Sequence, residues 1–430
     1  MSNTSLEQWL RRLETLHPRD IELGLERVRT VAQQLDLLPV SHRVVTVAGT
    51  NGKGSTVAVL EALLTEAGYR VGAFTSPHLL HFNERIRVNA ADASDKQIVD
   101  AFAAIDQARQ GISLTYFEFA TLAALLIFKE NALDIIVLEV GLGGRLDAVN
   151  IVDSTVSVIT SIDLDHQDWL GETRGQIARE KAGIVRNARP VVIAEPDPPP
   201  ELMESIIAVG AQPVYRLGHE FSVAVTGDEW QGQLQEGDGR QRELPPVHRG
   251  ALLPENIAAA LQAALLLDIQ YSEEVLHRAL AKSALAGRRQ IRKIGDCEYV
   301  LDVAHNPASV NKLLEYLVIS PCKGKTLCLF SVMSDKDIES IVSAAADRFD
   351  AWFLADQPGN QRAAAASMVA GLLTAAGQRM ISISKNLRQA LRRAQGIMVT
   401  GDRLVIFGSF YTVAGVLTLL NKDDMTHEAL

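Results

Sequence analysis

A glycine-rich run between a strand-like pattern and a helical pattern is the strongest chemical signal in the sequence. The β-branched run Arg43–Ala48 is followed by GTNGKGS at residues 49–55 and then by apolar residues at helical spacing. Glycines let backbone N–H groups approach a phosphate, a helix N-terminus adds favourable partial charge, and a lysine reaches the outer phosphates. The run departs from the strict P-loop pattern, because Val47 replaces its first glycine and Gly54 follows Lys53. We predict a phosphate cradle here, with an ordinary strand-to-helix turn as the alternative.

Acidic and imidazole side chains end two further strand-like runs. Glu139 lies near the end of the apolar run Asp134–Val140, where burying an unpaired carboxylate is costly. The run after it ends in four polar side chains, Asp163, Asp165, His166 and Asp168. Oxygen ligands with one imidazole suit Mg²⁺ beside nucleotide phosphates. We predict that Glu139 and His166 serve such a site, whereas the three aspartates fit turn and cap positions.

The last third of the chain carries its own polar group. The run Tyr299–Val303 contains Asp302 and is followed by AHNP at residues 304–307. These side chains indicate a polar site at a strand end, although Asn306-Pro307 is also typical of a helix entry. Arg288, further upstream, offers a positive charge for phosphate.

Two other motifs fail a closer test. GLGG at residues 141–144 follows a strand pattern, but the third glycine of a dinucleotide fingerprint would fall on Leu146. NKDD at residues 421–424 has the letters of a base-reading motif, yet it follows a helical pattern near the chain end, where we expect a solvated tail. A nucleotide-switched regulatory protein is therefore disfavoured.

The elements that must position these groups alternate between strand-like and helical patterns. In the first half the strand-like runs are Arg43–Ala48, Asp134–Val140, Thr155–Thr160 and Val191–Ala194. In the last third they are Tyr299–Val303, Thr326–Ser331, Ala351–Ala355, Met380–Ile383 and Leu404–Phe407. Such alternation predicts βαβ units and parallel sheets, whose ligands bind at the carboxyl ends of the strands. Residues 214–247 are polar and glycine-rich, which predicts a small antiparallel patch.

Composition limits the class of protein. The chain has 430 residues, of which 47% are apolar and 22% charged, as in ordinary globular proteins. Its net charge of −10 gives no broad attraction for nucleic acid or an anionic bilayer. The three cysteines lack metal-ligand spacing, and neither a signal peptide nor a membrane-spanning stretch is evident. We expect a cytoplasmic protein that binds neither nucleic acid nor membrane.

Taken together, the motifs resemble the folylpolyglutamate synthase/dihydrofolate synthase family of Mur-ligase-like, ATP-dependent amide ligases. The matching runs are VAGTNGKGS (47–55), TSPHL (75–79), ERIRVN (84–89), LTYFEF (114–119), EVGLGGRLDAVN (139–150), DLDHQDWLG (163–171), EKAGI (180–184), DVAHNP (302–307), DKD (335–337) and GSFYTVAG (408–415). The resemblance implies an α/β fold with two domains. Residues 1–287 would form a P-loop-type, parallel-sheet ATP-binding domain with a small antiparallel patch, and residues 288–430 a Rossmann-like glutamate-ligase domain.

The resemblance also implies ligands for individual residues. The predicted ATP contacts are Thr50, Asn51, Gly52, Lys53, Gly54, Ser55, Asn256, Arg288 and Asp302. The predicted ligands of two Mg²⁺ ions are Ser76, Glu139, His166 and Lys181, the last as a carbamate. From its helical pattern alone, Lys181 would face solvent, so its role rests on the family. Lys53, Lys181 and His166 would be the catalytic residues.

The implied substrates are a pteridine compound and L-glutamate. The predicted pteridine contacts are Thr115, Tyr116, Phe117, Glu118, Leu146, Asp147 and Ala148, and those near glutamate are His305 and Ser409. The expected activity is ligation of L-glutamate to dihydropteroate and to the γ-carboxylate of reduced folates, by a monomer in folate biosynthesis and one-carbon metabolism. The alternatives are a single-activity folylpolyglutamate synthase and another Mur-type amide ligase.

Overall fold

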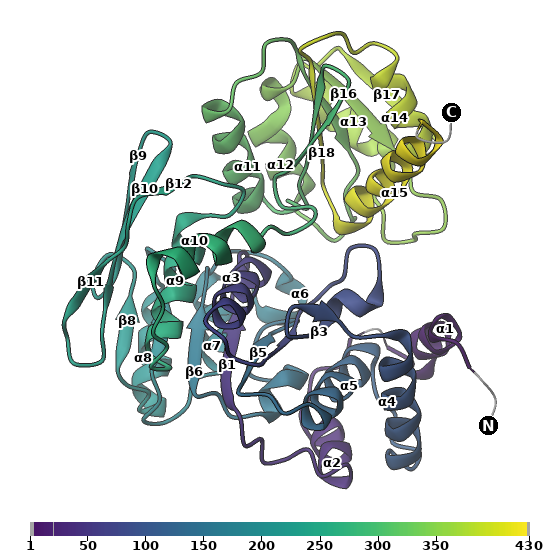
Figure 1. Cartoon of the computed structure of the whole chain (residues 1–430). Helices are drawn as coiled ribbons and strands as arrows, with labels where there is room; N and C mark the ends of the chain where they lie inside the picture. The colour runs from purple at the N-terminus through teal and green to yellow at the C-terminus, as the bar shows by residue number, and fades with distance from the viewer. Residues whose placement is uncertain (1–3, 20, 428–430) are drawn as a thin grey trace. The chain divides into compact units, whose positions relative to one another are not determined.

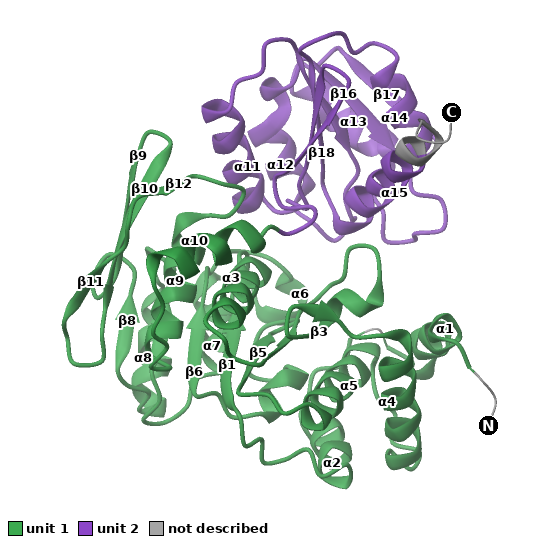
Figure 2. Ribbon diagram, viewed as in Figure 1, with its two compact units in different colours: residues 1–284 green, residues 285–430 purple. Residues whose placement is uncertain are grey.

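The computed structural model describes residues 4–19 and 21–427. The chain divides into two compact units, residues 1–284 and 285–430, and each has its own sheet (Figure 2). Both units are α/β, and both sheets are mainly parallel, which confirms the predicted fold class. No helix in the described part of the chain is long and apolar enough to span a bilayer.

The large sheet of the first unit positions the phosphate loop. Its strand order is β4-β3-β2-β5-β1-β6-β7-β8, and the pairs β2–β3 and β3–β4 are antiparallel while the others are parallel. The strands are β1 (Arg43–Ala48), β2 (Val71–Phe74), β3 (Ile86–Val88), β4 (Ala91–Asp92), β5 (Ile135–Glu139), β6 (Val156–Ile159), β7 (Val191–Ile193) and β8 (Val214–Arg216). Val47 of β1 pairs with Glu139 of β5 and with Val158 of β6. The chain therefore leaves all three strands at the same edge, which is where parallel sheets bind ligands.

Alternate residues of these strands face two separate cores. Val44 and Ala48 pack on one face, whereas Val45 and Val47 pack on the other. The first core is covered by α1 (Leu6–Leu16), α2 (Glu26–Gln34), α4 (Asp95–Ala108), α5 (Tyr116–Glu130), α7 (Arg174–Ala182) and α8 (Pro200–Val209). The second is covered by α3 (Lys53–Glu66), α9 (Pro254–Leu265) and α10 (Glu273–Lys282) (Figure 1). Burial on both faces explains why the central strands are continuous apolar runs.

A four-stranded antiparallel sheet confirms most of the predicted patch. Its strands are β9 (Ser222–Thr226), β10 (Glu229–Gln235), β11 (Gln241–Glu243) and β12 (Val247–His248) (Figure 1). The prediction was wrong for Val214–Arg216, because this segment is β8 and pairs in parallel with β7. Trp230 of β10 is fully buried in the second core, which ties the small sheet to α9.

The second unit has a six-stranded sheet of order β13-β14-β18-β15-β16-β17. The strands are β13 (Gln290–Ile294), β14 (Cys297–Leu301), β15 (Thr326–Phe330), β16 (Ala351–Ala355), β17 (Ile381–Ser384) and β18 (Arg403–Phe407). The helices are α11 (Pro307–Ile319), α12 (Ile338–Ala345), α13 (Ala366–Ala375), α14 (Leu387–Gln395) and α15 (Phe410–His427). Residues 421–424, expected as a tail, continue helix α15. β14 and β18 are parallel neighbours, so residues 302–305 and 408–410 emerge side by side.

Candidate active site

The glycine-rich loop between β1 and α3 is braced against the end of β6. Thr50 N donates to Ser161 O at 2.8 Å, and Asn51 N donates to Ser161 Oγ at 2.9 Å. Gly49 has φ +155°, and a Cβ added there would lie 1.8 Å from Thr160 Oγ1. Only glycine fits this position, because any side chain would collide with β6 and force the loop away from the sheet.

Lys53 is the first residue of α3, and its ammonium binds the backbone of the phosphate loop. Its Nζ donates to Gly49 O at 3.0 Å and to Thr50 O at 3.2 Å. Gly52 is left-handed, with φ +90°, and a Cβ there would lie 2.5 Å from Asn256 Oδ1 of α9. The structure therefore brings the predicted nucleotide contact Asn256 against the loop. An ammonium at a helix N-terminus can bind a phosphate.

The predicted metal ligands Glu139 and Ser76 meet beside this loop. Glu139 is buried at the end of β5, and its Oε2 accepts a hydrogen bond from Ser76 N at 3.2 Å. A Cβ on Gly54 would lie 3.5 Å from the same oxygen. The carboxylate therefore lies against the helix start, where a cation could join it to a phosphate.

His166 lies on the turn that precedes the short helix α6 (Gln167–Leu170). Its backbone is left-handed, with φ +51°, and its N–H donates to Asp165 Oδ1 at 2.9 Å. Asp163 Oδ1 accepts from Leu164 N at 2.7 Å, so both aspartates have the predicted turn role. The imidazole is partly exposed, and its Nε2 lies 4.0 Å from Asp165 Oδ1.

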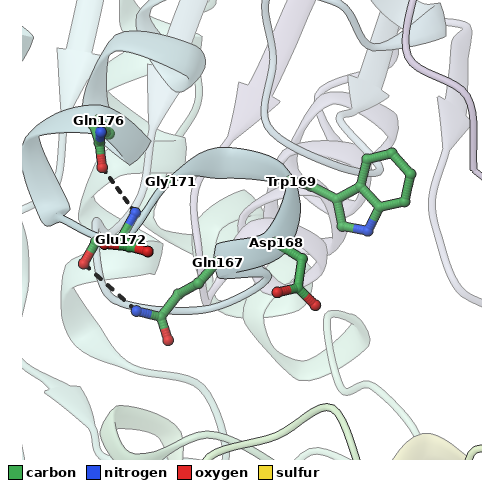
Figure 3. A pocket seen from close by; sticks show the side chains of 6 residues that line it. All are labelled: Gln167, Asp168, Trp169, Gly171, Glu172 and Gln176. Atoms are coloured by element: carbon green, nitrogen blue, oxygen red, sulfur yellow. Dashed lines mark hydrogen bonds between the residues drawn. The ribbon is translucent and has the colours of Figure 1, made fainter.

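An open pocket lies beside this turn (Figure 3). It is lined by Gln167, Asp168, Trp169, Gly171, Glu172 and Gln176. Glu172 N donates to Gln176 Oε1 at 2.8 Å, which holds the start of α7 against this turn. The lining is mostly polar, and the indole of Trp169 is exposed to solvent.

Lys181 on α7 is buried, with 2% of its surface exposed, so the expectation of a solvent-facing residue was wrong. Burial lowers the pKa of Lys181 well below its usual range, and the nearby charge of Lys53 lowers it further. Asp165 opposes this shift without cancelling it. The helical pattern missed this position because α7 contacts both α8 and α6, which a local pattern does not encode. The amine of Lys181 therefore lies within electrostatic range of Lys53 in the phosphate loop, and its burial favours the neutral form.

The predicted pteridine contacts begin at the N-terminus of α5. Thr115 is the N-cap, and it shares a reciprocal capping box with Glu118. Phe117 packs against β2 through Phe74, with ring centroids 5.8 Å apart. A Cβ on Gly141 would lie 2.6 Å from Phe117 Cζ, so a glycine there allows the loop after β5 to approach α5.

The Asp147 carboxylate is hydrogen-bonded within its own loop, residues 142–149, which follows β5. Oδ2 accepts from Leu142 N at 2.9 Å, and Oδ1 accepts from Val149 N at 3.1 Å. Burial raises the pKa of Asp147 to about 7, although these hydrogen bonds and the charge of Lys53 act in the opposite direction. Asp147 caps the short 3-10 helix Ala148–Ile151, so Ala148 begins that helix and Leu146 lies directly before the cap.

In the second unit, three predicted residues, Asp302, His305 and Asn306, follow the end of β14. Asp302 accepts hydrogen bonds from Arg289 N at 2.9 Å and from Ala304 N at 2.8 Å. His305 Nδ1 lies 2.8 Å from Val303 O. Asn306 is the N-cap of α11, as its Asn-Pro sequence predicts.

The ring of Phe410 contacts both Arg288 and His305. The sequence did not lead us to predict Phe410 as a site residue. The guanidinium carbon of Arg288 lies 5.0 Å from the ring centroid of Phe410, and the His305 ring lies 6.3 Å from it. Ser409 is buried, and its hydroxyl lies 2.8 Å from Thr412 Oγ1. The available signal was an aromatic residue directly after a glycine-serine pair at a strand end.

The donors near the phosphate loop suit a hard cation. Among residues 4–19 and 21–427, no three His, Cys, Asp or Glu side chains form a ready-made cage. Mg²⁺ is usually held by one or two carboxylates together with water and substrate phosphates. A buried carboxylate, Glu139, beside Gly54 and Ser76 fits that description.

Comparison with protein families agrees with this geometry. The Mur ligase middle domain matches residues 47–241, and the Mur ligase, glutamate ligase domain matches residues 287–410. The first match starts at the strand before the phosphate loop, and the second begins near Arg288.

Known proteins match over nearly the whole chain. The dihydrofolate synthase/folylpolyglutamate synthase of Escherichia coli is 39% identical over 97% of this chain and 96% of its own length. The structure of E. coli FolC in complex with DHPP and ADP has a TM-score of 0.92 at 38% identity, covering 98% of this chain and 99% of that one. The bifunctional enzyme of Yersinia pestis, complexed with AMPPNP and Mn, has a TM-score of 0.90 at 41% identity, covering 97% and 98%. By its sequence, its fold and the geometry of its phosphate loop, this chain belongs to the dihydrofolate synthase/folylpolyglutamate synthase family of Mur-type, ATP-dependent amide ligases.

Proposed function

We propose that this enzyme uses ATP to join L-glutamate to dihydropteroate, which forms dihydrofolate, and to the γ-carboxylate of reduced folates. The observation that carries the proposal is the buried Glu139 carboxylate beside Gly54 of the braced phosphate loop. This arrangement can hold a nucleotide triphosphate and a divalent cation together, as a ligase that activates a carboxylate requires. The relatives named for both activities support the same reaction.

The first step activates the acceptor. A carboxylate oxygen of the acceptor attacks the γ-phosphorus of ATP, the bond to the β,γ-bridging oxygen breaks, and an acyl phosphate and ADP result. Lys53 stabilises the charge on the transferring phosphoryl group, because its ammonium lies at the mouth of the loop. A divalent cation, when bound at Glu139, Ser76 and His166, would supply further positive charge to the phosphates.

The second step forms the amide. The amine of L-glutamate attacks the acyl carbon, inorganic phosphate leaves with its electron pair, and the nitrogen loses a proton. His305 and Ser409 stay predictions as residues near glutamate, and Arg288 and Asp302 stay predictions as nucleotide contacts. The hydrogen bonds that hold Asp302 and Ser409 in place support a binding role for both.

Lys181 supports a further part of the proposal. A neutral amine adds to carbon dioxide and loses one proton, which gives an anionic carbamate whose oxygens bind hard cations. Burial favours the neutral amine, because it lowers the pKa of Lys181 well below its usual range. The carbamate would then be a second cation ligand in the neighbourhood of Lys53.

The setting of the reaction is also part of the proposal. Small molecules are the expected partners, a monomer is the expected state, and the cytoplasm is the expected compartment. The three cysteines, Cys297, Cys322 and Cys328, are all free, which fits a reducing environment.

The test is a direct assay of both acceptors. Purified enzyme is incubated with MgATP, L-glutamate and either dihydropteroate or tetrahydrofolate, and products are identified by mass. We expect both acceptors to gain glutamate. Product from one acceptor alone would reduce the function to a single activity, and product from neither would overturn the proposal.

A further inference from the structure

A series of charged and titratable side chains connects the N-terminal segment, which includes His17, Glu22 and Gly24, to the predicted pteridine contacts at the start of α5. Arg27, on α2, lies between two carboxylates, those of Glu22 and Glu118. Glu118 belongs to α5, 91 positions away in the sequence. His17 Nε2 extends the series, 3.5 Å from Glu22 Oε2. No periodic pattern in the sequence indicates this contact.

Glu118 uses both of its carboxylate oxygens within the protein. Oε2 accepts from Thr115 N at 2.7 Å, and Oε1 accepts from Arg27 Nη2 at 3.2 Å. Only 4% of its side chain is exposed. A carboxylate held in this way fixes the start of α5, and we therefore assign it a positioning role, although the family resemblance made it a substrate contact.

Arg27 also holds Glu22 of the N-terminal segment, through both terminal nitrogens of its guanidinium. Nη1 pairs with Glu22 Oε1, and Nη2 donates to Glu22 O at 2.9 Å. A planar guanidinium can serve two carboxylates at fixed angles, which the single ammonium of a lysine cannot do. The 24% exposure of the Arg27 side chain leaves these pairs partly shielded from water.

The same N-terminal segment also reaches the second predicted pteridine segment. Gly24 N donates to Leu146 O at 3.3 Å. Residues 22–24 therefore contact both predicted pteridine segments, 115–118 through Arg27 and 146–148 through Gly24.

We infer that Arg27 is a positioning residue for the pteridine substrate, acting through Glu118 and Glu22 to align the segments 115–118 and 146–148. This inference rests on the proposed function, because the two segments can contact a pteridine, as the family resemblance implies, only if the enzyme acts on dihydropteroate. Without the guanidinium, Glu118 and Glu22 lose the cation between them, and the start of α5 loses its link to residues 22–24. A small misplacement of a binding group is enough to weaken catalysis markedly.

The test compares Arg27→Met, Arg27→Lys and Glu118→Gln with wild type, and uses Arg11→Met as the matched control. Arg11 forms an exposed ion pair with Glu7 on α1. For Arg27→Met we expect the KM for dihydropteroate to rise about tenfold, with the KM for ATP changed less than about twofold. Arg27→Lys should fall between Arg27→Met and wild type, and the control should match wild type.

The double variant Arg27→Met/Glu118→Gln separates positioning from general stability. Because the two side chains act as one unit, the double variant should raise the KM for dihydropteroate no more than the worse single variant. Equal changes in both KM values, or a KM for dihydropteroate that stays at the wild-type level, would overturn the inference. If Arg27→Met does not fold, Arg27→Lys decides by the same two KM values. Wild-type enzyme that forms no product from dihydropteroate would instead overturn the proposed function, and this inference with it.

Discussion

The predicted site residues of the two units differ in how their charged side chains are held. In the first unit, Lys181, Glu139 and Lys53 are charged or titratable groups that lie buried or folded into a loop. In the second unit, the Asp302 carboxylate is bound by backbone N–H groups, and Arg288 lies over an aromatic ring. The first arrangement removes water from around ionisable groups, whereas the second fixes geometry. We therefore expect substitutions of Lys53, Glu139 and Lys181 to affect phosphoryl transfer or the Mg²⁺ requirement, and those in the second unit to raise KM.

The largest effect should come from Lys53→Ala. Removing the ammonium removes the charge that stabilises phosphoryl transfer, so kcat should fall by about 100-fold or more while the fold survives. Lys96, exposed on α4, is the matched control, and Lys96→Ala should keep the wild-type rate. Retention of more than about a tenth of the rate by Lys53→Ala would contradict its role. The measurement is product formation at saturating substrates, with circular dichroism to check folding.

The next largest effect should be on the Mg²⁺ requirement, because His166 and Lys181 are proposed metal ligands in the first unit. His166→Ala and Lys181→Ala should each raise the Mg²⁺ concentration for half-maximal rate by about tenfold, since each removes a proposed ligand. His248, an exposed histidine of the small sheet, serves as the control. An unchanged Mg²⁺ titration for either variant would remove that residue from the metal shell.

A smaller effect should come from the second unit. Phe410→Leu removes the ring that contacts Arg288 and His305, so KM for ATP and for glutamate should rise about threefold to tenfold with kcat nearly unchanged. Tyr411, its exposed neighbour, provides the control Tyr411→Leu. A loss of kcat at constant KM would break the contrast between the units.

The smallest effect should appear in stability as a function of pH. The folded-state pKa of Asp147 is raised from 3.8 to about 7, so the folded state binds an extra proton between those values. Stability from this group is present below pH 4 and is lost as pH rises to about 7. Asp147→Asn should remove that slope, whereas exposed Asp228→Asn should keep it.

The measurement is Tm between pH 5 and 8, where the loss of stability from this group should lower Tm as pH rises. Asn leaves one N–H of the loop without its oxygen acceptor, so the slopes are compared and the absolute Tm values are not. Equal slopes in wild type and Asp147→Asn would contradict the raised pKa.

Local pattern predicted the fold where strands are long and β-branched. β1 and β16 begin and end at the predicted residues. β2, a central strand, was missed because Val71–Phe74 is short and contains Gly72, where a Cβ would lie 2.8 Å from Phe128. Its place in the sheet depends on tertiary packing, which no local pattern encodes.

The residues of the candidate site also divide into those that a local pattern predicts and those that depend on tertiary packing. The phosphate loop and Glu139 were predicted from their types and their positions at strand ends. The burial of Lys181 and the Arg27–Glu118 contact come from segments that meet only after folding. The family resemblance identified Lys181, but it did not indicate that loss of water around the buried amine lowers its pKa.

The brace between the phosphate loop and β6 has a consequence for the rate and the strength of nucleotide binding. Thr50 and Asn51 are held by hydrogen bonds to Ser161, and Gly49 lies close against Thr160, all through contacts within the protein itself. The conformational entropy of ordering this loop is thus lost during folding of the chain and not during each catalytic cycle. Binding can then be reversible and fast, so that ADP leaves a loop that is already shaped for the next ATP.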